Sequence, residues 1–458
     1  MRSIVFFFVA LAVGAAAFAA ALIFNNEYVF FAGYTVLHFV VLATAWNILG
    51  GYCGYVNFGS AAFFALGAYS TVFLHKTYPL PIPLLIIVGG LVSGMVGLGT
   101  GYLTLRLRGA FFAIATLALA VVLQTLVVNW DYVGGARGAY VIRPNSIAIG
   151  PWTISYMQYL FASMMVLAVI ALTTARLIER SRLGYGFAAI RDDELAAEAC
   201  GVPTLRLKLI ATTLSGAFMG MAGAPFPYYI GYLQPSSAFG LEYAVNSIAM
   251  PMIGGTTSWV GPLVGALLLA TLQQIATVTI SSHLNLLIVG LLLVGFVIAA
   301  PNGIVGLVRE FLRVAAPSGP DKRSVAVILL AIYAFLSGIF GIVLGLAALM
   351  SGRSGLLLAV GILALVLAVL YLASFYGLLT MQPWSPAVAL AAFGLSLPLA
   401  AASIAMDHSS LRNTVLEGAT VVIALFAVWM LRRQDVTALY RSNAIADLVI
   451  ARTQGAAP

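Results

Sequence analysis

Residues 176–208 read RLIERSRLGYGFAAIRDDELAAEACGVPTLRLK and carry eleven charged side chains. The whole chain has only 22 Lys and Arg and 14 Asp and Glu, so nearly a third of its charge lies in this one stretch. The sequence on both sides is almost entirely apolar. A chain that gathers its charge into one internal loop presents that loop to water, where a partner can reach it. The stretch therefore predicts a membrane protein with one large polar loop.

The composition supports a membrane protein. Hydrophobic residues make up 62% of the 458 residues and charged residues 8%, against roughly 45–50% and 25% in soluble domains. The net charge of +8 fits Lys and Arg in cytoplasmic loops better than nucleic-acid binding. The two cysteines, Cys53 and Cys200, lie in unrelated contexts, and the four histidines are scattered. We therefore expect no disulfide, no metal site and no bound cofactor.

Apolar runs near the spanning length of about twenty residues predict an all-α fold of many membrane helices. Ten runs precede a basic Pro- and Gly-containing linker, and four follow it. The first run could instead be a signal peptide. We expect a first domain at 1–310, a cytoplasmic linker at 311–323 and a separate four-helix membrane module at 324–458. The expected helices are 4–24, 29–49, 58–74, 82–103, 111–130, 156–178, 205–230, 243–253, 260–280, 284–300, 325–350, 356–379, 386–406 and 414–431.

The distribution of basic residues predicts the orientation of these helices. With Arg2 in the cytoplasm, alternation of the helices places residues 176–208, the linker and the pair Arg432 and Arg433 on the same side. Cytoplasmic loops of membrane proteins are enriched in Lys and Arg. The pattern therefore predicts a multi-pass protein of a bacterial inner membrane with both termini in the cytoplasm.

Stripes of glycine predict where helices touch. Gly90, Gly94, Gly97 and Gly101 fall on one face of a single helix, and small residues allow close backbone approach in lipid. Two further stripes follow the same spacing, and they comprise Gly216, Gly220 and Gly223 in one helix and Gly261 and Gly265 in another.

A short helix is predicted inside the charged loop. Asp192 can cap its start, which places Asp193 and Glu194 in the first turn, where the helix dipole favours anions. Gly201 suits the position after the last helical residue, and Pro203 prevents continuation. A small helix of this kind can dock into a groove of a partner protein. The alternative is an amphipathic helix that lies on the membrane surface.

The sequence lacks the motifs of an energy-converting enzyme. It contains no Gly-x-x-x-x-Gly-Lys-Ser/Thr phosphate loop. Acidic and basic residues are nearly absent from the expected helices, whereas proton- or ion-coupled carriers need ionisable groups at the midplane. We therefore expect energy to enter from outside the chain.

Four stretches resemble permeases of ABC transporters of the branched-chain amino-acid class, the LivM type, over residues 28–310. They are 51–69 (GYCGYVNFGSAAFFALGAY), 105–118 (LRLRGAFFAIATLA), 186–202 (GFAAIRDDELAAEACGV) and 252–265 (MIGGTTSWVGPLVG). The chain differs from that family at Ser60, where members usually carry His. It also continues beyond Pro301-Asn302-Gly303, where such permeases usually end.

The resemblance implies a ten-helix, type II-like importer permease without an ATPase site of its own. It implies two cytoplasmic ABC ATPase subunits, a second homologous permease subunit and an extracytoplasmic solute-binding protein that docks near 131–155 and 231–243. The solutes implied are branched-chain or other small amino acids, or amide- or urea-like compounds. The residues implied in docking of the ATPase are Arg191, Asp192, Asp193, Glu194, Ala197, Glu198 and Gly201.

Polar residues in or beside the expected helices are candidates for lining a translocation path. They are Asn47, Asn57, Ser60 and Thr116, and polar residues inside membranes tend to face the bundle interior. Ordinary hydrogen bonding between helices explains them equally well. Two other functions stay open: a passive channel or secondary carrier for a small polar solute, and a membrane scaffold.

Overall fold

The computed structural model confirms an all-α polytopic membrane protein. It describes residues 3–23, 26–78, 80–104, 107, 109–149, 152–279, 290, 303–306, separate residues between 330 and 349, 355–379, 382–406, 421 and 424–431. Among these residues, six helices are long and apolar enough to cross a membrane. They are Glu27–Leu49, Ile82–Thr104, Ala110–Val128, Tyr156–Glu179, Thr204–Ile230 and Leu358–Leu378.

The described helices form two compact units, one with residues Met1–Gln274 and Leu286–Leu307, the other with Ile275–Asn285 and Val308–Pro458. Helices occupy every expected segment up to residue 279. In the first unit they are α1 (Ser3–Ile23), α2 (Glu27–Leu49), α3 (Ser60–Thr77), α4 (Ile82–Thr104), α5 (Ala110–Val128), α6 (Tyr156–Glu179), α7 (Arg182–Asp192), α8 (Glu194–Ala199), α9 (Thr204–Gly223), α10 (Phe226–Ile230), α11 (Pro235–Ala238), α12 (Leu241–Gly254) and α13 (Val260–Thr279).

The expected helix at 205–230 is present as one spanning segment, Thr204–Ile230, with a two-residue turn at Ala224 and Pro225 inside it. Helix α9 ends at Gly223, and the short α10 starts after Pro225. Proline has no backbone N–H and its ring crowds the preceding turn, so it favours a break at this point. Helix α10 then ends at Gly231, whose φ of 78° is accessible mainly to glycine. Ala224 and Pro225 themselves keep right-handed helical dihedrals and are buried.

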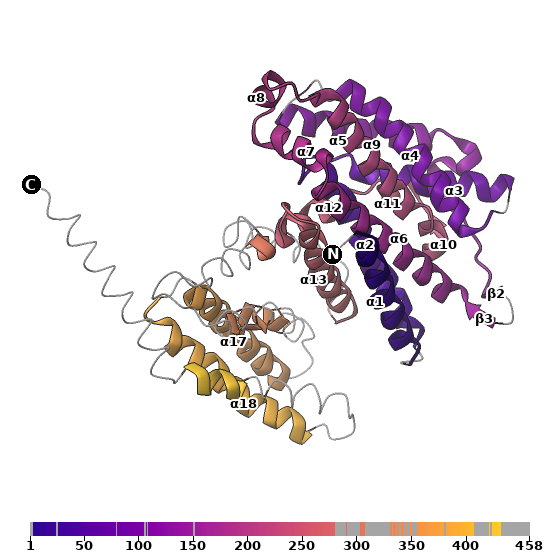
Figure 1. The fold of residues 1–458 in the computed structure, drawn as a ribbon. Coiled ribbons are helices and arrows are strands. Elements are labelled where there is room, and N and C mark those ends of the chain that lie inside the picture. The colour runs from indigo at the N-terminus through magenta and orange to yellow at the C-terminus, as the bar shows by residue number, and fades with distance from the viewer. Residues whose placement is uncertain are drawn as a thin grey trace, which may run out of the picture. The chain divides into compact units, whose positions relative to one another are not determined.

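The glycine stripes pack helices closely, as the sequence predicted. Helix α9 lies beside α3 and α4 (Figure 1). A β-carbon added at Gly220 would lie 2.5 Å from the carbonyl oxygen of Gly89, and one at Gly97 would lie 3.2 Å from that of Thr212. Real side-chain atoms do not approach that closely at Gly220, so only glycine fits between α9 and α4. The glycines of α13 likewise lie against the backbone of α12.

Two small antiparallel sheets, which the sequence did not reveal, order the loops at the ends of the helices. Strand β1 (Ala139–Tyr140) pairs with β4 (Tyr232–Leu233), with Ala139 opposite Leu233. Strand β2 (Ser146–Ile149) pairs with β3 (Trp152–Ser155), which leads directly into α6. The β1–β4 pair joins the two loops on which we expected a solute-binding protein to dock.

The second unit contains α17 (Gly355–Leu379) and α18 (Ser385–Met406), which pack together. Glycines of preceding helical residues approach α17: a β-carbon at Gly341 would lie 3.1 Å from that of Ala368. The rings of Phe335 and Phe375 lie 4.7 Å apart. The expected helices 284–300, 325–350 and 414–431 and the linker 311–323 lie wholly or largely outside the described residues.

Candidate functional site

The charged loop folds into two short helices with well-defined ends. Helix α7 begins after Ser181, whose side chain accepts a hydrogen bond from the backbone N–H of Gly184. Helix α8 begins after Asp193, whose Oδ1 accepts hydrogen bonds from the N–H groups of Leu195 and Ala196 at 2.9 and 3.1 Å. The expected cap, Asp192, is instead the last residue of α7. The sequence pattern was off by one residue because two aspartates stand side by side and either can cap.

The end of α8 is as predicted. Gly201 has a φ of 81°, the left-handed conformation that glycine adopts without steric cost. Its N–H donates to the carbonyl of Glu198, and the N–H of Val202 donates to that of Ala197 at 3.0 Å. These bonds satisfy carbonyls that the helix end leaves without partners. Helix α8 is thus capped at both ends between α7 and α9.

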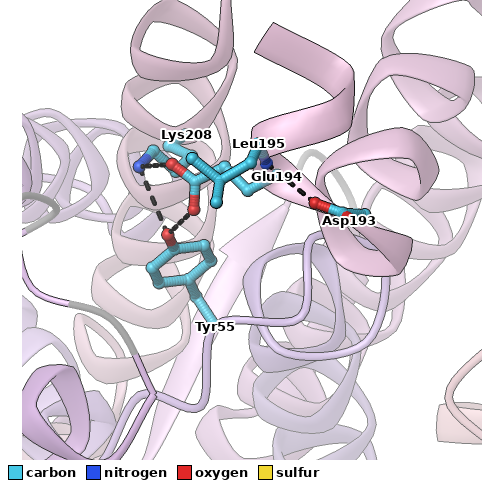
Figure 2. Close-up of polar contacts among 5 residues, drawn as sticks. All are labelled: Tyr55, Asp193, Glu194, Leu195 and Lys208. Carbon is cyan, nitrogen blue, oxygen red and sulfur yellow. Dashed lines mark hydrogen bonds and ion pairs between the residues drawn. The ribbon is translucent and has the colours of Figure 1, made fainter. Parts of the chain in front are cut away.

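A buried ion pair holds α8 against the rest of the bundle. Lys208 Nζ in α9 donates to Glu194 Oε1 at 2.7 Å and to the Tyr55 hydroxyl at 3.2 Å (Figure 2). The Tyr55 hydroxyl in turn donates to Glu194 Oε2. The side chains of Lys208 and Glu194 are only 5% and 12% exposed. Glu194 therefore points inward, and its carboxylate ties α8 to α9 and to the loop that follows α2.

The outer face of α7 and α8 exposes two large apolar side chains among its charges. Leu195 is 64% exposed and Tyr185 is 73% exposed. Both side chains are therefore accessible to a partner protein or to the membrane surface. Of the seven residues expected in docking, Ala197 is buried and Glu194 is largely buried, and the other five are exposed, namely Arg191, Asp192, Asp193, Glu198 and Gly201.

The loop between α2 and α3 connects this surface with the interior. Arg191 Nη1 lies 3.5 Å from the carbonyl oxygen of Gly51, and a β-carbon at Gly54 would lie 3.0 Å from the Arg191 side chain. A cleft of about 410 Å³ opens beside Glu194, between this loop and the start of α5. The loop thus contacts α7 through Arg191 and α8 through Tyr55.

Three of the four path candidates gather where this loop enters α3. Asn57 Oδ1 accepts a hydrogen bond from Gly59 N–H at 2.8 Å, and Thr116 Oγ1 accepts one from Phe58 N–H at 3.2 Å. Ser60 Oγ lies 2.9 Å from the hydroxyl of Ser247 in α12. These bonds fix the start of α3. Asn47 is buried at the end of α2, and its amide has no hydrogen-bond partner among the described residues.

The two cysteines differ sharply in environment. Cys53 is buried in the same loop, and Cys200 is exposed at the end of α8. Burial raises the pKa of the Cys53 thiol to about 12, the nearby Glu194 charge adds to this rise, and Lys208 opposes it. The Cys53 thiol therefore stays protonated at neutral pH, while Cys200 is open to solvent.

Sequence reasoning missed four residues of this site: Tyr55, Tyr185, Leu195 and Lys208. Lys208 carried a signal, because a lysine one turn inside an apolar helix needs a partner. Leu195 and Tyr185 carried a weaker one, as apolar residues inside an otherwise charged segment. Tyr55 could not be found from the sequence. It lies in the loop after α2, more than 130 residues before its partners Glu194 and Lys208.

Comparison with known proteins agrees with this architecture. Residues 28–297 match the family of permease components of branched-chain amino acid transport systems. The chain is 28% identical to the high-affinity branched-chain amino acid transport permease LivM of Salmonella typhimurium, over 62% of this chain and 72% of that protein. It is 27% identical to LivM of Escherichia coli, over 60% of this chain and 69% of that protein.

A permease of different specificity is also similar. The chain is 28% identical to the autoinducer 2 import system permease LsrC of an Enterobacter strain, over 50% of this chain and 65% of that protein. No solved structure matches the chain. Because the family match covers more than half of its residues, the chain belongs to the family of permease components of branched-chain amino acid transport systems.

Proposed function

We propose that the chain is the membrane permease subunit of an ATP-driven importer for branched-chain or other small neutral amino acids. The observation that carries this proposal is helix α8. It is capped at both ends, it exposes Leu195 beside charged residues, and it is tied to α9 by the Glu194–Lys208 ion pair. A capped helix that is anchored to the bundle and exposes an apolar residue suits docking of a partner that moves the bundle. The chain itself has no phosphate loop, so ATP is hydrolysed by separate subunits.

The contacts of α8 supply a mechanical route to the interior. Movement of α8 displaces Lys208 in α9 and Tyr55 in the loop before α3 at the same time. Helix α9 is packed on α3 and α4 through glycines, so it moves them as a block. The loop leads to Asn57 and Ser60, which fix the start of α3 against α12. Nucleotide binding drives this shift only if it favours one arrangement over the other.

The proposal includes a defined set of partners. Two ATPase subunits dock at α7 and α8, and a second homologous permease subunit completes the path. A solute-binding protein docks on the opposite face, where Tyr140 in strand β1 and Ile142 just after it are largely exposed. The complex lies in the bacterial inner membrane, with ten helices in the permease domain and both termini in the cytoplasm.

We also propose that residues 324–458 form a separate four-helix membrane module after a linker at 311–323. The described part of this region has its own packed interior, in which α17 contacts α18 and the glycines of preceding residues. The family match ends at residue 297. A chain that stops at Asp321 should therefore still insert and co-purify with the ATPase subunits, whereas loss of assembly would show that the module belongs to the transporter core.

The experiment that tests the function is uptake of radiolabelled leucine by the complete complex in proteoliposomes. We expect leucine uptake to require ATP on the side of the membrane that carries the ATPase subunits. It should also require a saturating concentration of the binding protein on the other side of the membrane. The non-hydrolysable analogue AMP-PNP is the control. Uptake at the same rate without ATP would support a passive channel or secondary carrier instead. ATP hydrolysis by the purified permease chain alone would contradict the proposal that separate subunits hydrolyse ATP.

A further inference from the structure

Helix α2 carries a histidine that neither the sequence motifs nor the docking site involve. His38 lies in the interior of the first unit and is 2% exposed. Five aromatic rings lie within 6.1 Å of its ring centroid: Tyr34 and Phe39 in α2, Phe64 in α3, Phe226 in α10 and Tyr243 in α12. These six residues are called the aromatic cluster below. They bring together four elements that are distant in the sequence.

The cluster contains polar atoms without partners. Three polar atoms, the two ring nitrogens of His38 and the hydroxyl oxygen of Tyr34, have no hydrogen-bond partner among the residues that the structure describes. Buried polar groups are almost always hydrogen-bonded, because burial without a partner costs folding free energy. Phenylalanine would fill similar space at either position without this cost. These polar atoms are therefore available to a hydrogen-bond partner from outside the described residues.

The position of the cluster suits a translocation path. His38 is eleven residues from the start of α2, which corresponds to roughly 17 Å along the helix axis and so to the middle of a hydrocarbon layer about 30 Å thick. Two of the four elements are α10, which follows the turn at Ala224 and Pro225, and the beginning of α12. Interrupted helices at membrane depth occur where they are buried in protein or line a cavity, and in transporters they form substrate sites.

The chemistry of the cluster selects a class of solute. It contains no Asp, Glu, Lys or Arg, so nothing in it balances a net charge on a solute. A neutral imidazole offers one donor and one acceptor, and the Tyr34 hydroxyl offers a further donor. Aromatic faces attract an ammonium group and also pack against an apolar side chain. A zwitterionic amino acid with an apolar side chain satisfies all of these groups at once.

We propose that the aromatic cluster is the site in the translocation path that contacts zwitterionic amino acids with apolar side chains. The carboxylate binds the His38 and Tyr34 donors, and the ammonium group and side chain lie against the rings. The rings fill the site in this structure, so Phe226 and Tyr243 separate from His38 when the solute passes. This inference rests on the proposed function, because it assigns a solute site within the same permease.

The test is leucine uptake by the complete complex in proteoliposomes, with His38→Phe and Tyr34→Phe in separate preparations. Each change removes polar atoms and keeps an aromatic ring. We expect the thermal midpoint and ATPase co-purification of both variants to equal or exceed those of the wild type. We expect kcat/KM for leucine to fall at least tenfold in His38→Phe, which corresponds to about 1.4 kcal/mol. His38→Gln, which keeps a donor and an acceptor, should recover part of this loss.

His75→Phe is the matched control, because His75 lies outside the cluster and its Nδ1 is hydrogen-bonded to the Tyr228 hydroxyl at 2.9 Å. It should leave leucine uptake within about twofold of wild type, a shift well under 1.4 kcal/mol. Unchanged kcat/KM in both His38→Phe and Tyr34→Phe, with ATP-driven uptake intact, would overturn the inference alone. Absence of ATP-driven leucine uptake by the wild-type complex would overturn the proposed function and this inference with it. If His38→Phe fails to assemble, Tyr34→Phe decides the question.

Discussion

The Glu194–Lys208 ion pair offers a sharp test of how α8 is held. Glu194→Gln keeps the shape of the side chain but removes its charge, and Lys208→Met does the same for its partner. At 2.7 Å the gross attraction is about 6 kcal/mol at an effective dielectric constant of about 20. Desolvation of both charges offsets much of it. What remains large is the cost of leaving one buried charge alone, about 3–5 kcal/mol.

We therefore expect each single variant to lose about 3 kcal/mol in the free energy of unfolding. The double variant, Glu194→Gln with Lys208→Met, should lose only about 1 kcal/mol or less, because no isolated charge is buried. The difference, a coupling energy of about 5 kcal/mol, is the measured quantity. SDS-induced unfolding of the purified chain in detergent provides it. Glu198→Gln is the matched control, since Glu198 lies on the exposed face of the same helix and should shift stability by less than about 0.5 kcal/mol.

The same variants distinguish a role of the Glu194–Lys208 ion pair in transport from a role in folding. If α8 transmits motion through this contact, the double variant should fold but support little leucine uptake. The reason is that a Gln–Met contact holds α8 to α9 less strongly than an ion pair does. We expect uptake below one-tenth of wild type, together with normal co-purification of the ATPase subunits. If the double variant loses as much stability as the two single variants together, the ion pair itself is refuted. Full uptake in the double variant would show that the pair serves folding alone.

Three further predictions concern neighbouring features. Leu195→Asp should abolish co-purification of the ATPase subunits without changing the thermal midpoint, because Leu195 is exposed; retained co-purification would instead favour a helix that lies on the membrane surface. Gly220→Ala should cost about 1–3 kcal/mol from overpacking against α4, whereas Gly99→Ala, where a β-carbon meets nothing within 4 Å, should be neutral in the same SDS unfolding assay. At pH 7.5, N-ethylmaleimide should label Cys200 and spare Cys53, whose pKa is raised to about 12. Bound ATPase subunits should protect Cys200 from the reagent. Mass spectrometry of the labelled peptides measures both effects.

The sequence predicted the fold to the extent that local rules act on it. Apolar runs located the helices within a few residues, because the thickness of the bilayer sets their length. The glycine stripes predicted that α4 and α9 each make a close helix contact, because small residues allow backbones to approach; that they contact each other came from the structure. Gly201 fixed the end of α8 for a similar reason. Each of these inferences depends on residues within one helix or one turn.

The misses have a different physical origin. The expected helix at 205–230 is present as one spanning segment, Thr204–Ile230, but the turn at Ala224 and Pro225 within it was not predicted, although proline itself was a signal. Asp193 replaced Asp192 as the cap, a choice that the neighbouring turn decides. Glu194 was expected to face a partner, but its carboxylate is largely buried against Lys208 and Tyr55. That contact joins three segments, and no local pattern contains it.

His38 shows how a sequence rule can be stated and then applied too narrowly. An ionisable residue inside a membrane helix points to function, and this rule applies to His38 in α2 as it does to Asp, Glu, Lys and Arg. Its five ring neighbours come from four elements, so the cluster exists only in the folded bundle. The proposed docking surface on α7 and α8 and the aromatic cluster are connected through α3, because Tyr55 lies in the loop before it and Phe64 lies one turn within it. A shift of α8 that moves the start of α3 therefore also moves one wall of the cluster, which is the link that an importer needs between ATP hydrolysis and its solute.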